Sequence, residues 1–375
     1  MAATWTRALV PDRLRKPIDA LHLLRATGML GRPALLLAQL RARRGARRLQ
    51  RALFYHRYAT AALLAHEAGV FEALAGRPLS PDELARACDL RPRAAAALLR
   101  ILESEGTVAR EAERYRLSHV GRVHLLRSAE LSMTPTLDIM AAQAAAFADV
   151  REGLRTGRPP AQLDIFQPEA RCDAFLDAVN DFLYWAGVDL LHRIQLPRVE
   201  SFIVGSMGVS FSARVLARFP NARVTYGCLD HLVREVPRLR TRYGVPDNAV
   251  EGMHAHGGDP TADRWGDEAF DLVLLTKKMI LEPEQRTGEK FATKAFDVLR
   301  PGGVAVLWET VHPTGRPTPL PRAMEAVMDL IASPDGPLNE EHSLREMLAR
   351  IGYRDVEVVP CLGGQTTFVV ARKPG

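Results

Sequence analysis

The C-terminal half of the chain alternates short apolar runs with longer stretches of helical periodicity. The apolar, β-rich runs are SFIVG (201–205), ARVTYGC (222–228), FDLVLLT (270–276) and GVAVLWET (303–310). The residues between successive runs are numerous enough for helices, which is typical of parallel strands covered on both faces. The pattern therefore predicts an α/β domain over residues 197–375, with any ligand at the carboxyl ends of its strands.

The N-terminal half has helical periodicity instead. Residues 58–76 (YATAALLAHEAGVFEALAG) carry apolar side chains at helical spacing and end in a glycine, a common helix stop. Ser80 is followed by Pro81 and, three positions after the serine, by Glu83, which is the pattern of a capping box at the start of another helix. We therefore expect residues 51–196 to be mainly helical.

A further helix and a hairpin are expected after this capping box. Residues 91–105 have helical periodicity, and residues 107–118 (TVAREAERYRLS) have the pattern of two short strands around a polar turn. This order resembles a winged helix, which in other proteins binds DNA or forms dimers. Arginines in the helix leave DNA binding open, but RAAAALLR (93–100) is apolar on several faces, which favours dimerisation. We expect a homodimer and no nucleic-acid partner.

Basic charge is concentrated at the N-terminus. Residues 1–51 hold eleven Arg and one Lys against two acidic residues, whereas the whole chain has a net charge of only +6. The stretch RARRGARRLQR (41–51) would suit nucleic acid or anionic lipid. The leucines at 35–40, however, begin an apolar stripe at helical spacing with arginines on the other face. This favours a basic helical arm, residues 1–50, packed on its own subunit or on a partner.

Length and composition exclude several classes of protein. A chain of 375 residues can fill two cores. Its apolar runs are too short to cross a bilayer and no signal-peptide pattern opens it, so we expect a soluble, cytoplasmic protein without stable membrane insertion. The four cysteines are widely spaced, and HAHGGD (254–259) is a weak metal signal that fits a turn of solvated histidines better. We expect no disulfide and no metal site.

The motif VLRPGG (298–303), together with the spacing from RFPNARVT through GGD and LLTKKM to it, resembles a known family. This is the class I S-adenosylmethionine-dependent small-molecule methyltransferases of the hydroxyindole, caffeate and polyketide-tailoring type. The resemblance covers about residues 50–372 and implies a Rossmann-like methyltransferase domain after a mainly α winged-helix dimerisation domain. It also implies a homodimer, a bacterial tailoring pathway and a small-molecule substrate bound between the domains.

The glycine-rich turn after the first strand departs from the pattern of this family. The family has an aspartate and four glycines here, whereas the chain has Ile203 at the acid and keeps only Gly205 and Gly208 as candidate cofactor-binding glycines. Such a turn needs glycine for positive φ and for close approach of the ligand. We therefore expect Met207 to narrow the methionine and ribose site.

The acids that bind the cofactor are also incompletely retained. Cys228 stands where the family has the aspartate that binds the ribose hydroxyls, and Asp230 follows two residues later. A thiol is a poor bidentate acceptor, and Asp230 could replace the acid only if the strand end bulges. Asp259 matches the acid near the adenine, although it could equally cap a turn, and Lys277 is a further candidate. These departures predict weak or absent binding of S-adenosylmethionine.

The catalytic pattern of the O-methylating members is partly lost. The position of their histidine base is Leu281, which cannot accept a proton, whereas Glu309 matches one of their two catalytic glutamates. We expect Glu309 to act as a general acid or base, desolvated by Trp308 and Met279, with His312 or Lys277 as its partner. The alternative is that Glu309 only pairs with an arginine.

Three functional hypotheses remain open from the sequence. The favoured one is a natural-product enzyme that catalyses a rearrangement, cyclisation or elimination without methyl transfer. The alternatives are an active methyltransferase and a non-catalytic partner subunit. In each enzyme hypothesis the substrate pocket is expected to be apolar, and its candidate residues are Phe175, Phe182, Trp185, Met279 and Leu281.

Overall fold

The computed structural model of the protein describes residues 54–129, 132–146, 155, 172–256, 268–276, 287–315, 317–320, 322–323, 325 and 339–375. Contacts divide the chain into two compact units, residues 1–118 and 119–375, which are described separately below. The predicted basic arm and the candidate residues Asp259, Lys277, Met279 and Leu281 lie outside the described residues.

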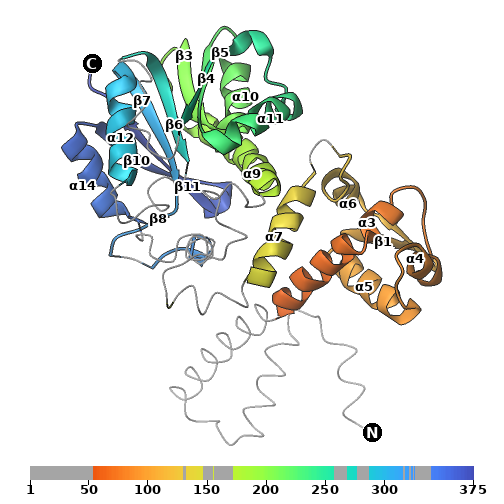
Figure 1. The fold of residues 1–375 in the computed structure, drawn as a ribbon. Coiled ribbons are helices and arrows are strands. Elements are labelled where there is room, and N and C mark those ends of the chain that lie inside the picture. Colours follow the sequence, from red (N-terminus) through yellow and green to blue (C-terminus); the bar gives the residue numbers. More distant parts are fainter. Residues whose placement is uncertain are drawn as a thin grey trace, which may run out of the picture. The chain divides into compact units, whose positions relative to one another are not determined.

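The first unit is a set of helices followed by a two-stranded hairpin (Figure 1). After helical residues 54–67, its elements are α3 (Val70–Ala73), α4 (Pro81–Ala87), α5 (Pro92–Ser104), β1 (Val108–Glu111) and β2 (Arg114–Leu117). β1 and β2 pair in antiparallel orientation, and Leu79 adds a bridge to Tyr115. The expected second helix and the hairpin are therefore present.

The capping box predicted at the start of α4 is confirmed. The Oγ of Ser80 accepts from the N–H of Glu83 at 3.3 Å, and the Ser80 N–H donates to the Glu83 carboxylate at 2.8 Å. Arg77 and Arg114 pair with the same carboxylate at 3.2 and 2.7 Å, so β2 is tied to α4. The main-chain hydrogen bond from Ser80, aided by both arginines, lowers the pKa of Glu83 to about 2. The residue therefore stays ionised in all but strong acid.

α5 buries one face rather than several. Ala95, Leu99 and Leu102 are buried, while Ala94 and Ala97 on the opposite side are exposed within the described part of the chain. The sequence predicted a helix that is apolar on several faces because alanine counts as apolar on the exposed side as well as on the buried side. Small side chains on the exposed face leave it smooth, which suits close approach of another chain.

The second unit is built on a seven-stranded sheet with the order β10-β11-β7-β6-β3-β4-β5. Its strands are β3 (Ser201–Gly205), β4 (Arg223–Leu229), β5 (Val250–His256), β6 (Phe270–Thr276), β7 (Leu299–Glu309), β10 (Arg354–Cys361) and β11 (Thr366–Arg372). β3 to β7 pair in parallel orientation, and β11 is antiparallel to both β7 and β10. A small parallel pair, β8 (Val311–His312) with β9 (Asn339–Glu340), lies beyond the end of β7.

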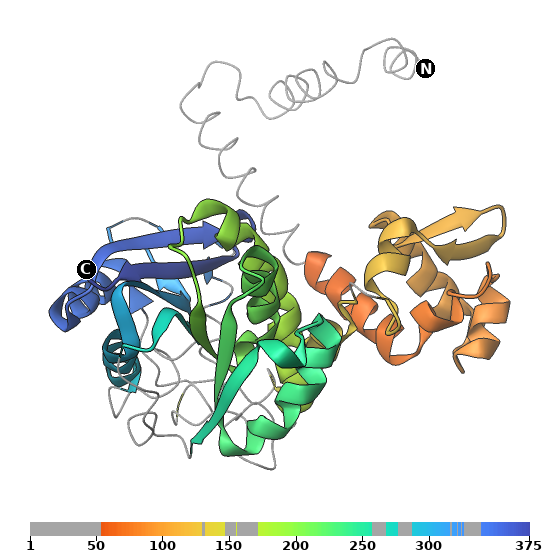
Figure 2. The same cartoon turned by 90° about the horizontal axis from the view of Figure 1, so that it is seen from above.

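Helices cover both faces of this sheet (Figures 1 and 2). The helices of the unit are α6 (His119–His124), α7 (Thr134–Ala146), α9 (Cys172–Arg193), α10 (Val209–Arg218), α11 (Val236–Tyr243), α12 (Thr287–Val298) and α14 (Glu341–Ile351). Residues of α9, α10 and α11 share one core with the sheet, and residues of α12 and α14 share a second core on its other face. Among the described helices, none has the length and apolar character needed to cross a membrane.

The four strands predicted from the apolar runs are confirmed, and β7 shows why they were visible. Along β7, Val304, Val306 and Trp308 belong to the core with α9 and α10, whereas Ala305 and Leu307 belong to the core with α12 and α14. A strand buried on both faces reads as a continuous apolar run. β5 was not predicted: its residues 254–256 were expected in a turn, but they pair with β4 as a strand.

The strand order places a topological switch beside β3. The chain proceeds from β3 to β4 and β5 on one side, then returns to β6 and β7 on the other side of β3. The helices that follow β3 and β6 therefore lie on opposite faces, and open α/β sheets generally bind their ligands at the carboxyl ends of such strands. Gly205 ends β3 and Thr276 ends β6 at this point.

Candidate functional site

Two glycines lie side by side near the carboxyl ends of β3 and β4. Gly205 at the end of β3 is the register partner of Gly227 in β4. A Cβ atom on Gly205 would lie 3.4 Å from the carbonyl oxygen of Gly227 and 4.0 Å from Oγ1 of Thr276, the buried residue that ends β6. Because both glycines lack side chains, a ligand can approach the main chain of both strands here.

The turn after β3 is a short 3₁₀ helix, residues 206–208, that runs directly into α10. Gly205 has φ −78° and Gly208 has φ −111°, so the expectation that this turn needs glycine for positive φ is wrong. Gly208 is required for packing instead, since a Cβ there would lie 2.8 Å from Cδ2 of Leu274 and 3.2 Å from Cβ of Val204. The turn therefore lies tightly on β3 and β6.

Met207 packs into the core of the second unit. Its side chain is 5% exposed and belongs to the cluster formed by the sheet with α9 and α10. The sequence suggested that its bulk would narrow the methionine and ribose site. Since the core accommodates the thioether, and a flexible methionine fills irregular spaces well, this bulk is taken up inside the protein.

Cys228 and Asp230 occupy different environments at the end of β4. The Cys228 side chain is 1% exposed and lies in the same core as Met207. The β4 register shows no irregularity at this end, so the bulge considered from the sequence is not there. Asp230 comes directly after the strand as the first residue of a 3₁₀ helix (Asp230–Glu235), and it is exposed. Asp230 thus offers a solvent-accessible carboxylate at the carboxyl end of β4, three residues after Gly227.

Glu309 is completely buried at the end of β7. Its Oε2 accepts from Nδ2 of Asn339 at 3.5 Å, and its main-chain oxygen accepts from Oγ1 of Thr367. The same Thr367 hydroxyl accepts from the N–H of Val311 at 3.1 Å, which secures the chain as it leaves the sheet. A buried carboxylate is costly unless it is paired, so this residue has a specific role in structure or chemistry.

The two other described candidate residues near Glu309 in the sequence are His312 and Trp308. His312 lies in β8, half-buried, with Nδ1 at 3.1 Å from Oγ1 of Thr318. Trp308 precedes Glu309 in β7, so the two side chains point to opposite faces of the sheet. Trp308 stacks on Phe182 of α9 at 5.8 Å, and its indole N–H donates to Oγ1 of Thr366 at 2.6 Å. The expectation that Trp308 desolvates Glu309 is therefore wrong.

Two of the predicted pocket residues line the core on the α9 side. Phe175 and Phe182 are partly buried and pack against the cluster shared with α10, while Trp185 is 42% exposed. The structure thus brings Phe182 to Trp308 and leaves Trp185 at the surface. Contact of these three side chains with a substrate stays a prediction.

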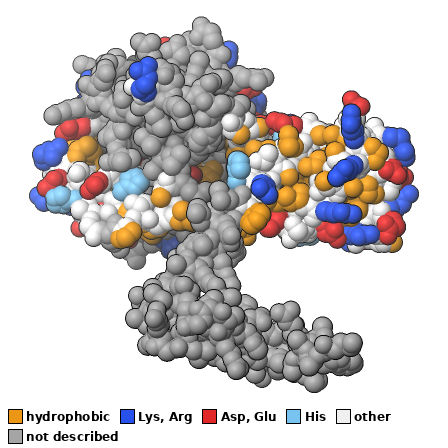
Figure 3. Space-filling model, turned by 90° about the horizontal axis from the view of Figure 1, so that it is seen from below, with side chains coloured by type: hydrophobic (Ala, Val, Ile, Leu, Met, Phe, Trp, Pro, Cys, Tyr) orange, Lys and Arg blue, Asp and Glu red, His pale blue; other side chains and the backbone are white. Residues whose placement is uncertain are grey.

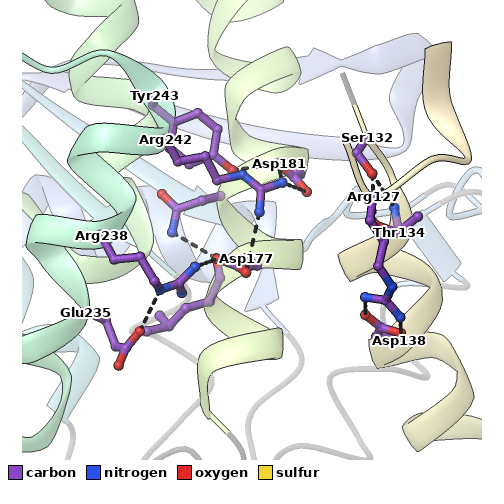
Figure 4. Close-up of polar contacts among 12 residues, drawn as sticks. Arg127, Ser132, Thr134, Asp138, Asp177, Asp181, Glu235, Arg238, Arg242 and Tyr243 are labelled. Atoms are coloured by element: carbon purple, nitrogen blue, oxygen red, sulfur yellow. Dashed lines mark hydrogen bonds and ion pairs between the residues drawn. The ribbon is translucent and has the colours of Figure 1, made fainter. Parts of the chain in front are cut away.

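A partly buried polar network between α9 and α11 was missed in the sequence (Figure 4). Arg242 donates to both carboxylate oxygens of Asp181 at 2.9 Å, and the Tyr243 hydroxyl donates to one of them at 2.6 Å. Asp177, one helical turn earlier in α9, lies 2.7 Å from Arg238 and 3.4 Å from Arg242. Burial raises the pKa of Asp181 against the opposing effect of the Tyr243 hydrogen bond. The acids and the arginines each repeat at four-residue spacing, a signal that could have revealed this network.

Comparisons with known proteins agree with this architecture. Residues 50–127 match the O-methyltransferase dimerisation domain. The tetracenomycin polyketide synthesis 8-O-methyl transferase TcmO of Streptomyces glaucescens is 25% identical over 340 residues, covering 84% of this chain and 94% of that protein. In its N-terminal part the chain is thus similar to the dimerisation domain of O-methyltransferases, and over most of its length it is similar to one O-methyltransferase. The resemblance stated from the sequence is thereby confirmed.

Solved structures show the same methyltransferase fold over nearly the whole chain. Human N-acetylserotonin methyltransferase in complex with SAM matches with a TM-score of 0.73 at 16% identity, covering 88% of this chain and 98% of the other. N,N-8-amino-8-demethyl-D-riboflavin dimethyltransferase (RosA) from Streptomyces davawensis matches with a TM-score of 0.70 at 18% identity, covering 88% and 99%. The predicted fold class, a Rossmann-like methyltransferase domain after a dimerisation domain, is confirmed.

Proposed function

We propose that the chain is an S-adenosylmethionine-dependent methyltransferase that acts on a small molecule in a biosynthetic pathway. The observation that carries the proposal is the pairing of Gly205 with Gly227 beside the topological switch, where ligands of such sheets bind. Related proteins named as methyltransferases of tetracenomycin and riboflavin-type compounds support it. Methyl transfer therefore replaces the non-methylating step that the sequence favoured.

The residues at this surface fit the cofactor. Gly205 and Gly227 are register partners in β3 and β4, and neither has a side chain that would stand between the main chain and an adenosyl group. The exposed carboxylate of Asp230 is a bidentate acceptor of the kind that a ribose diol requires. When bound, the cofactor supplies an electrophilic methyl group. The chain's own part is to hold the sugar, to exclude water and to orient the substrate atom that is methylated.

Replacing Asp230 with Asn is expected to weaken binding of the product S-adenosylhomocysteine by roughly ten- to a hundredfold. Each charge-assisted hydrogen bond lost to the ribose is worth about 1.5–3 kcal/mol. Isothermal titration calorimetry measures the affinity directly. Asp247→Asn is the matched control, because this exposed acid pairs with Arg240 away from the strand ends. Unchanged affinity in Asp230→Asn would exclude the assigned ribose contact.

A methyltransferase fold used without methyl transfer is the second candidate. It is favoured by Cys228, which is buried where the family has its ribose-binding acid. The same titration separates the two proposals: wild-type protein that gives no heat with S-adenosylhomocysteine at millimolar concentration supports the second candidate. A non-catalytic partner subunit would behave in the same way, and would also lack turnover with every substrate tested.

We further propose that the first unit forms a homodimer, because residues 50–127 match a dimerisation domain. Phe54, Tyr55 and Leu64 of its first described helix are 62%, 48% and 51% exposed, and apolar side chains are spread over the visible face of this unit on the right of Figure 3. Burying such surface stabilises by about 25 cal/mol per Å². Light scattering at micromolar concentration should give twice the mass of the 41.4 kDa chain. The Leu64→Asp variant should shift the mass toward the monomer, whereas a monomeric wild type would refute the proposal.

A further inference from the structure

Asn180 is a fully buried amide in the middle of α9, and both ends of its side chain are engaged. Its Nδ2 donates to the carbonyl oxygen of Leu176, one turn earlier in the same helix, at 2.9 Å. Its Oδ1 accepts from the N–H of Ser210, 30 residues later in the chain, at 2.9 Å. The amide therefore links α9 to the first turn of α10.

The start of α10 needs such an acceptor from elsewhere. The first N–H groups of a helix have no partner within it, and a side chain of the preceding residue usually accepts from one of them. Here that residue is Gly208, which has no side chain and makes no cap. Exchange for Ser or Asp would cost packing, because a Cβ would lie 2.8 Å from Cδ2 of Leu274 and 3.2 Å from Cβ of Val204. Asn180 supplies the missing acceptor from a neighbouring helix.

This contact helps to fix the backbone that ends β3. α9 packs directly against the turn at residues 206–208 as well as against α10. Further along α10, the Ser212 hydroxyl is hydrogen-bonded to the Tyr226 hydroxyl of β4 at 2.8 Å, inside the same core. The turn is thus fixed by packing at Met207 and Gly208 and by a hydrogen bond at Ser210. The hydrogen bond to Ser210 comes from a single side chain outside the turn, that of Asn180.

We propose that Asn180 is a positioning residue for the cofactor: through the Ser210 N–H, it holds the turn after β3 in the geometry that binds the adenosyl group. The inference rests on the proposed function, because it assigns Asn180 to that same site. Asn180 itself is buried and acts through the main chain. Its loss removes order from the free protein, and binding must then restore that order, which lowers affinity.

The experiment compares Asn180→Leu with Asn180→Asp. Leucine fills a similar volume but leaves the Ser210 N–H without an acceptor. Aspartic acid keeps an oxygen in its place, and burial favours its neutral form, whose O–H can still donate to the Leu176 carbonyl oxygen. We expect Asn180→Leu to weaken binding of S-adenosylhomocysteine about tenfold in calorimetry, and Asn180→Asp to stay within about twofold of wild type. In the ligand-free protein, hydrogen exchange of the peptide spanning residues 206–216 should be faster in Asn180→Leu than in Asn180→Asp.

Tyr353→Phe is the control for a general loss of stability. It removes one buried hydrogen bond, from the Tyr353 hydroxyl to the carbonyl oxygen of Ala292 at 3.0 Å, in the core on the other face of the sheet. It should lower the melting temperature without changing affinity or the exchange of residues 206–216. If Asn180→Leu also lowers only the melting temperature, the role is merely structural and the inference is overturned.

Failure of the proposed function gives a different result. If the wild-type protein does not bind S-adenosylhomocysteine, the proposed cofactor is wrong. The proposed effect of Asn180 on affinity is then wrong as well. Hydrogen exchange still tests whether Asn180 holds the turn after β3. Unchanged exchange of residues 206–216 in Asn180→Leu shows that the turn does not depend on this residue. If Asn180→Leu does not fold, the less disruptive Asn180→Ala is measured in the same way.

Discussion

Substituting Gly208 with alanine is expected to destabilise the second unit by about 1–3 kcal/mol and to weaken cofactor binding at least tenfold. The added methyl group would lie 2.8 Å from Cδ2 of Leu274 and 3.2 Å from Cβ of Val204. The Leu274 side chain can rotate, but Val204 Cβ is held in β3 by the strands that pair on both its sides. The turn must therefore move outward, toward the place where the cofactor would bind.

Chemical denaturation and calorimetric titration measure the two effects. Gly252→Ala is the matched control, since this glycine lies in the same sheet, has ordinary φ, and a Cβ there would be 3.7 Å from Thr225. Its alanine variant should be close to wild type in both measurements. Equal stability of the two variants would show that the core around Leu274 accommodates the added methyl group. Close packing at Gly208 would then not be what holds the turn in place.

Substituting Glu309 with glutamine is expected to lower turnover by about a hundredfold once a substrate is known, with the fold retained. Glutamine has the shape of glutamate and can still accept from Asn339, so the change removes chiefly the charge. If the carboxylate acts as a general base, its loss should also remove the acid limb of the pH–rate profile. Activity assays over a range of pH, with circular dichroism as the check on folding, measure both.

Asn339→Ala separates this role from a structural one. It removes the 3.5 Å hydrogen bond to Glu309 but leaves the carboxylate in place. A positional role for the pair would make both variants lose stability and turnover together, with unchanged pH dependence. Full activity of Glu309→Gln would show that the buried glutamate only secures the end of β7.

The sequence by itself determined the elements that depend on residues close to one another in the chain. The strands at 201–205 and 270–276, and the apolar part of β7 within the predicted run 303–310, were visible because burial on both faces makes a strand apolar throughout. The capping box of Ser80 and Glu83 was visible because its partners are three residues apart. The motif at 298–303 placed these elements in a methyltransferase fold.

Only the tertiary structure decided the chemistry of the turn after β3. The glycine pattern suggested positive φ and a site obstructed by Met207, but the chain forms a 3₁₀ turn in which Met207 lies in the core and Gly208 is required by its neighbours. The side chain that caps the following helix, Asn180, comes from 30 residues earlier. Such contacts depend on which segments the fold brings side by side, and the order of residues along the chain carries no direct signal of that.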